Sequence, residues 1–209
     1  AGALAHLRAR EAAMDIASCM SVVEQVSAEC PAALHPHMRA LLAWLAPQDP
    51  PSGGFEALAQ GACRILSNVL PSWKALVDAH AHEAMAQHLQ VALSALLGST
   101  DTGLVRAATH CFCITTTALG GDPIPLLKHF NLGLTHLRTI LESRAALDER
   151  QQLDACRQAC VAGTTLEFLD VDALAEAGGE GAQGPAGAGG MAGAAAWLLS
   201  VLCLTVRPR

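Results

Sequence analysis

Between Leu104 and Asp172 the chain carries three runs of apolar residues at helical spacing, separated by two short breaks. Leu104 to Leu119 is apolar on most sides, which predicts a helix covered on two faces. Gly120 and Gly121 end this run. The second run has a single apolar side, made by Leu127, Phe130, Leu134, Leu137 and Leu141. The pattern predicts packed helices, and it predicts no strand in this stretch.

The breaks contain residues that start helices. Asp122 is a fair N-cap with Pro123 at the first helical position, and Pro125 leaves a start two residues later open. Asp148 followed by Gln151 resembles a capping box that opens the third helix. Free amides at the helix start after Gly121 could bind an anion, but the two prolines remove two donors. An ordinary turn between helices is therefore the better interpretation.

Residues before this stretch repeat the pattern more weakly. Helices are expected over residues 3–28, 37–45, 55–69 and 85–97, with a short helical piece over 73–78. Cys30-Pro31, Pro71 and Gly98 are expected to end three of these helices. Residues 46–54 form a loop by their proline and glycine content.

Cys63, Cys111 and Cys160 occupy similar places in three successive helices and lie 48 and 49 residues apart. Each of these helices is followed by a break and a further amphipathic helix. The period is at the edge of the HEAT and armadillo range. The sequence therefore predicts an all-α protein, a HEAT/armadillo-like α-solenoid of stacked antiparallel helix pairs. A compact, unrelated helical bundle is the alternative.

Three regions are expected along the chain. Residues 1–176 form the helical repeats, 177–193 a glycine-rich flexible insertion, and 194–209 a helix of a further repeat. Because the chain starts at Ala1 and ends in Arg207-Pro208-Arg209 without a polar cap, a segment of a longer polypeptide is expected.

The net charge limits the classes of function that the chain can have. The net charge of -6 argues against a chain-wide grip on nucleic acid, which requires clustered Lys and Arg. A local strip of basic residues that binds nucleic acid is still possible. The same residues would equally be found on the solvated faces of helices without such a role. The candidates are Lys74, Lys128, Arg138, Arg144 and Arg150.

All eight cysteines lie in apolar helical patterns and are interpreted as buried thiols of an intracellular protein. Cys111 and Cys113 point about 200° apart on a helix, which is unsuited to joint metal ligation. Cys156 and Cys160 share a face, but that face is apolar. Buried packing is the expectation for both pairs.

Histidines cluster twice, with His80, His82 and His88 in one group and His35 and His37 in the other. Zinc requires convergent ligands from both halves of a site, and no matching second half is visible. Surface histidines are therefore expected, and no metal, cofactor or catalytic residue is assigned. No Ser–His–Asp pattern or Walker loop occurs, so the chain is not expected to be an enzyme.

Gly181 to Val206 contains no charged residue, so a membrane segment has to be considered. About 15 of these residues are compactly apolar, which spans about 22 Å as helix against a hydrocarbon core of about 30 Å. A packed helix is favoured over a membrane segment.

Arg157, Gly163, Asp170 and Asp172 form the spacing Arg-x5-Gly-x6-Asp-x-Asp. This spacing resembles a helix in the HEAT-repeat portion of the Nipped-B family, also called sister chromatid cohesion protein 2, the cohesin loader. The two helices before it there are similar to this chain at Leu104-Val105, His110-Cys111, Phe130 and Leu137. The resemblance covers about residues 34–206.

This resemblance implies a hook-shaped solenoid in the nucleus that engages cohesin subunits and DNA, stimulates the cohesin ATPase and promotes loading onto chromatin for sister chromatid cohesion. It implies a scaffold without a cofactor, a small-molecule substrate or a membrane. Two other classes remain: a generic HEAT or armadillo adaptor of cytoplasm or cilium that binds only proteins, and a helical membrane-associated protein.

Overall fold

The computed structural model describes residues 18–46, 54–126, 128–130 and 148–168. Every regular element within these ranges is a helix, so the all-α class is confirmed for them. Several predicted features lie outside the described residues: the 46–54 loop apart from its ends, most of the one-sided helix after Leu127, the insertion at 177–193 and the helix at 194–209.

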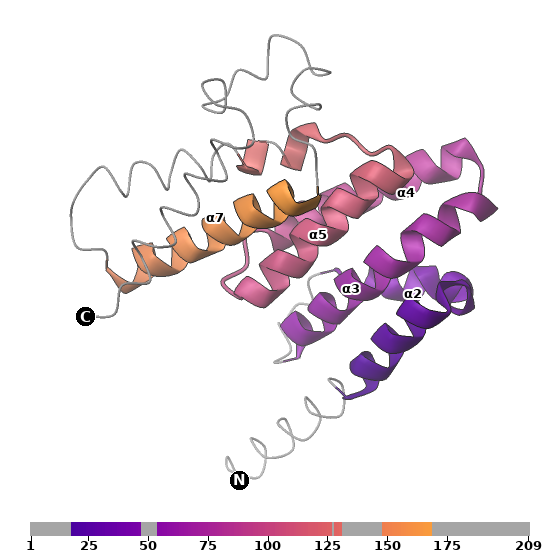
Figure 1. The fold of residues 1–209 in the computed structure, drawn as a ribbon, viewed down its shortest axis with the longest axis horizontal. Helices are drawn as coiled ribbons and strands as arrows, with labels where there is room; N and C mark the ends of the chain where they lie inside the picture. The colour runs from indigo at the N-terminus through magenta and orange to yellow at the C-terminus, as the bar shows by residue number, and fades with distance from the viewer. Residues whose placement is uncertain (1–17, 47–53, 127, 131–147, 169–209) are drawn as a thin grey trace.

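The elements follow one another as successive helices (Figure 1). Residues 18–29 are helical, and Cys30 ends this helix before Pro31, as expected. Seven elements follow, and two of them are 3-10 helices: η1 (Pro31–His37), α2 (Met38–Ala43), α3 (Phe55–Trp73), η2 (Lys74–Leu76), α4 (Ala79–Leu96), α5 (Thr102–Leu119) and α7 (Glu149–Phe168). Between α5 and α7 a further helix begins at Ile124.

Two predicted boundaries are wrong. Helix α3 continues through Pro71 to Trp73, although Pro71 has no N–H to donate to the carbonyl four residues earlier. Helix α4 begins at Ala79 rather than near Met85. Its N-cap is Asp78, whose carboxylate accepts a hydrogen bond from the Ala81 amide at 2.8 Å.

Two predicted helix ends are confirmed. Gly120 ends α5 with a φ of 71°, a left-handed conformation that glycine adopts without a steric penalty. The capping box at the start of α7 is present. Gln151 Oε1 accepts from the Asp148 amide at 3.1 Å, and Asp148 Oδ1 accepts from the Gln151 amide at 2.8 Å.

Helix α5 is the centre of the described core, since it contacts α3, α4 and α7. Its apolar character on most sides is explained by these neighbours, and Phe112 is fully buried. Burial of one such side chain contributes roughly 1.5–3 kcal/mol. The buried threonines of α5 donate to carbonyls one turn back, as Thr109 does to Val105 at 2.8 Å and Thr115 to Cys111 at 2.8 Å.

Candidate interaction surface

The helix of residues 18–29 lies parallel to α3. Met20 packs directly on Gly61, where a β-carbon would have no room. Further along both helices, an Arg64 nitrogen lies 3.4 Å from a Glu24 carboxylate oxygen, and Asn68 donates to Ser27 at 2.9 Å. The contacts advance in the same direction on both helices, so the two run side by side in parallel.

The same relation recurs along the next seam. The Gln60 amide lies against Gly103, and Cys63 contacts Cys111. Both contacts advance in the same direction, which makes α3 and α5 parallel. Helix α4 connects the end of α3 to the start of α5 and therefore runs in the opposite direction, and it packs on α5.

The seam between α5 and α7 is the third of the series. Cys160 Sγ donates to the Thr102 carbonyl at 3.7 Å, Arg106 and Glu167 form an ion pair at 4.0 Å, and the His110 and Phe168 rings lie 4.0 Å apart. Four parallel helices therefore follow one another: residues 18–29, α3, α5 and α7. We call this arrangement the helix row, and Figure 1 shows α3, α5 and α7 in this order.

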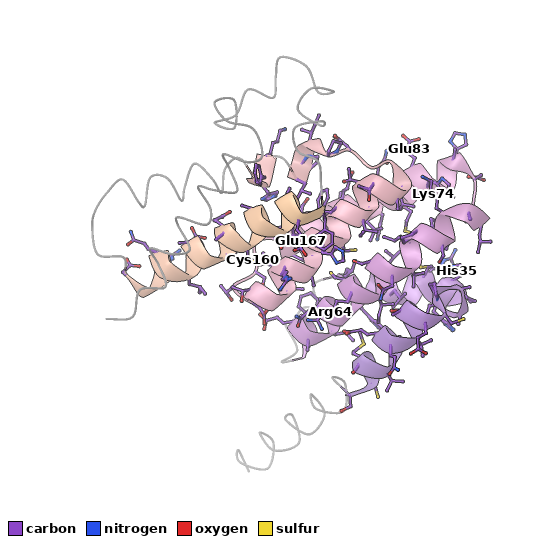
Figure 2. All side chains as sticks on the ribbon, viewed as in Figure 1. His35, Arg64, Lys74, Glu83, Cys160 and Glu167 are labelled. Carbon is purple, nitrogen blue, oxygen red and sulfur yellow. The ribbon has the colours of Figure 1, made fainter. Side chains whose placement is uncertain are left out.

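Two of the three seams carry an ion pair at the surface. The side chains of Arg64 and Glu24 are 52% and 26% exposed, and those of Arg106 and Glu167 are 67% and 55% exposed. In Figure 2, Cys160 and Glu167 lie on α7 beside α5, and Arg64 lies farther across the row on α3. Pairs this exposed contribute little stability, but they leave both signs of charge available to a partner.

The corner between α3 and α4 is held by two histidines. His82 Nε2 donates to the Lys74 carbonyl at 2.7 Å, and the His82 ring packs edge-on against Trp73 with centroids 6.1 Å apart. His35 lies 2.9 Å from the Ser72 hydroxyl, which itself donates to the Val69 carbonyl. Because a carbonyl only accepts, the Ser72 proton is used, so His35 Nε2 is the donor to Ser72.

The prediction that the histidines lie at the surface is correct for His37, His80 and His88, which are exposed. His35 and His82 are half-buried. Within the described ranges, no group of three or more His, Cys, Asp or Glu converges as metal ligands would.

The turn after α5 is organised by α4. Gln90 donates to the Asp122 carbonyl at 2.6 Å, and its amide nitrogen lies 2.7 Å from the position a Gly121 β-carbon would take. Asp122 accepts from the Ile124 amide at 2.9 Å, as the predicted N-cap would, and the regular helix begins at Ile124, within the two residues that the prediction left open. The ordinary turn is confirmed.

The thiols divide into two groups. Cys63, Cys111 and Cys113 are fully buried, as expected. Cys19 and Cys30 are exposed and Cys160 is half-buried, so the prediction that all cysteines are buried is wrong. Their helices carry apolar residues on more sides than their neighbours cover. Cys156 and Cys203 lie outside the described side chains.

Arg157 joins three segments of the chain. Its guanidinium donates to the Gly98 carbonyl at 3.2 Å and pairs with Asp154 one turn earlier, while its Nε is buried with no hydrogen-bond partner. Arg157 also lowers the pKa of His129, after the larger effect of burial. The hydrogen bond to Gly98 therefore links α7 to the α4–α5 loop.

Gly163, Asp170 and Asp172 are the other residues of the Arg-x5-Gly-x6-Asp-x-Asp spacing. Gly163 is exposed, and a β-carbon there would meet nothing within 4 Å. Asp170 and Asp172 lie outside the described residues. Of the five basic candidates, Lys74, Lys128 and Arg150 are exposed, and Arg138 and Arg144 lie outside the described residues.

No helix among the described residues is both long and apolar enough to cross a bilayer, and the uncharged stretch from Gly181 to Val206 lies outside them. Comparison with known proteins returns no match to a family model, to a curated protein or to a solved structure.

Proposed function

We propose that this chain is a segment of a HEAT/armadillo-like solenoid that acts as a binding scaffold and not as an enzyme. The helix row carries this proposal. A solenoid stacks the first helices of successive repeats in parallel, with second helices returning between them. The parallel order of residues 18–29, α3, α5 and α7 supports this proposal, with η1, α2 and α4 lying between them in sequence.

A scaffold of this kind binds through its surface. The exposed seams present Arg64, Glu24, Arg106 and Glu167, which are spread over neighbouring helices. A partner that contacts two neighbouring helices would meet positive and negative side chains at a fixed spacing. Such charge complementarity contributes more to specificity than to affinity.

The partners we propose are cohesin subunits and DNA, with loading of cohesin onto chromatin in the nucleus as the role. The support for these partners is the resemblance to the Nipped-B family in residues 104–172. Within that stretch, Arg157 joins α7 to the α4–α5 loop at Gly98.

A protein-binding adaptor without a nucleic-acid role is the second candidate. It is favoured by the net charge of -6 and by the pairing of Arg64 and Arg106 with carboxylates, which reduces their attraction for phosphate.

The test is binding of the chain to purified cohesin and to duplex DNA over a range of salt concentrations. The cohesin-loader proposal expects binding to both, and each phosphate contact removed lowers the salt slope by about one unit. The variants are Lys128→Gln, Arg138→Gln, Arg144→Gln and Arg150→Gln, with Arg39→Gln on α2 as the control.

Binding to neither partner contradicts the cohesin-loader proposal and leaves the adaptor. An unchanged salt slope in all four variants excludes these residues as phosphate contacts. The solenoid itself is tested separately by hydrogen exchange, where neighbouring helices of the row should open in sequence rather than all together.

A further inference from the structure

The helix of residues 18–29 leaves one side uncovered. It packs on α3 through Met20 and Ser27, which are buried, while Cys19, Val22, Val26 and Cys30 are exposed. Val22 is 63% exposed and Val26 is 38% exposed.

These four positions fall within about 80° of the helix circumference. The Cys30 amide still donates to the Val26 carbonyl at 2.8 Å, so Cys30 keeps the register of the helix although it is the residue after its end. We call Cys19, Val22, Val26 and Cys30 the N-terminal stripe.

The N-terminal stripe reads the same in both directions: thiol, valine, valine, thiol. A two-fold axis passing between Glu24 and Gln25 would place Cys19 of one copy level with Cys30 of the other, and it would bring Val22 to within one residue of the level of Val26. An interface between identical copies requires this self-complementarity, in which residue i meets residue j and j meets i. We propose that the N-terminal stripe docks a second copy of this chain, with the two helices antiparallel.

Charge around the stripe agrees with this occupant. Glu29 is the charged residue beside it, and Glu29 already accepts a hydrogen bond from Gln25 at 3.0 Å. In the antiparallel arrangement Glu29 of one copy lies on the same flank as Ser18 of the other, whose hydroxyl is able to donate to it. Among residues 18–30, no like-charged residues are brought together and no cation is offered to a nucleic acid.

The size of the stripe sets the strength of the contact. Twelve helical residues are about 18 Å long and about 10 Å wide, so the footprint is on the order of 200 Å² per copy. A standard stable interface covers about 800 Å² per partner. The dimer is therefore weak, with a dissociation constant no tighter than about 10 µM, and it forms in proportion to concentration.

A disulfide between Cys19 and Cys30 would show how the two copies of the chain are arranged. Cys19 and Cys30 of one chain are about 16 Å apart along the helix, and a disulfide requires Cα atoms within about 7 Å. A Cys19–Cys30 disulfide therefore forms only between copies. In mild hydrogen peroxide the two thiols lose two hydrogens to form the S–S bond, and one peroxide is reduced to two waters.

The experiment uses the full chain from about 10 µM to about 1 mM. Sedimentation velocity follows the dimer, and peptide mapping identifies the disulfides formed in peroxide. We expect a dimer that rises with concentration and a Cys19–Cys30 linkage. Val22→Glu and the milder Val22→Ser should lower the yield of that linkage, Val22→Glu by about 10-fold or more.

Val91→Glu is the matched control, because Val91 is 76% exposed on α4 and belongs to no part of the stripe. Three results would each overturn the proposal: a monomer at the highest concentration, Cys19–Cys19 and Cys30–Cys30 linkages in place of Cys19–Cys30, or an equal loss of linkage in Val91→Glu. Circular dichroism shows that each variant is folded before it is compared.

Discussion

Cys63 on α3 and Cys111 on α5 are neighbours, and both side chains are fully buried. Hydrogen bonding to the Cys111 thiol, followed by burial, raises the pKa of Cys63 well above its ordinary value. Burial raises the pKa of Cys113 to about 12. Thiolate, the reactive form, is therefore scarce at these two positions in the folded chain.

Alkylation by iodoacetamide should divide the cysteines by their place in the fold. We expect Cys19 and Cys30 to react in native buffer, and Cys63 and Cys113 to react at least about 100-fold more slowly until urea unfolds the chain. Mass spectrometry of the peptides measures the modification at each site. Equal rates at Cys63 and Cys19 in native buffer would contradict the buried thiol pair.

Two glycines should respond in opposite directions to the same substitution. Gly120→Ala places a β-carbon at a φ of 71° and is expected to lower the free energy of unfolding by about 1 kcal/mol. Gly163→Ala adds a methyl group in open space within α7 and should raise it by about 0.5–1 kcal/mol. Urea unfolding measures both variants, and a shift of the same sign in the two would refute this assignment.

The N-caps of α5 and α7 allow a paired test. Asp101 accepts from the Leu104 amide at 2.8 Å, and Asp148 accepts from the Gln151 amide at 2.8 Å. Asp101→Ala and Asp148→Ala are each expected to cost about 1 kcal/mol of stability, while the corresponding Asn variants keep the acceptor and lose much less. If Asn is as damaging as Ala in urea unfolding, the carboxylates do not act as caps.

Local signals predicted much of the fold. The spacing of apolar residues located the helices, Gly120 ended α5, and Asp148 with Gln151 formed the capping box. Each of these depends on residues within one or two turns of each other. The expected helix end at Pro71 is wrong, because α3 continues to Trp73 although proline lacks the N–H of a helical residue.

Features that depend on distant neighbours could not be predicted. The exposure of Cys19 and Cys30 follows from which side of their helix α3 covers, and a single helix pattern does not contain that information. The roles of His35 and His82 depend on Ser72 and on the Lys74 carbonyl, which reach them only once η1, η2 and α4 meet at the corner. Partner residues for His110 and Arg106 likewise come from α7, more than 50 residues away in sequence.

Stability should fall as the pH is lowered, because of two half-buried histidines. Burial lowers the pKa of His110, with a further decrease from Arg106 and an opposing increase from Glu167. Burial and then Arg157 lower the pKa of His129. The unfolded chain, with ordinary pKa values of about 6.5, therefore binds protons at a higher pH than the folded chain does.

As the pH falls below about 6.5, proton binding therefore stabilises the unfolded state more than the folded state. The free energy of unfolding decreases until the pH has passed below the pKa values of the folded state. Urea unfolding at about pH 7.5 and about pH 5.5 measures this decrease. His110→Gln and His129→Gln should each reduce it, because glutamine does not titrate, and His88→Gln on the exposed side of α4 is the control. A decrease that persists in full in the double variant His110→Gln/His129→Gln would show that other groups cause it.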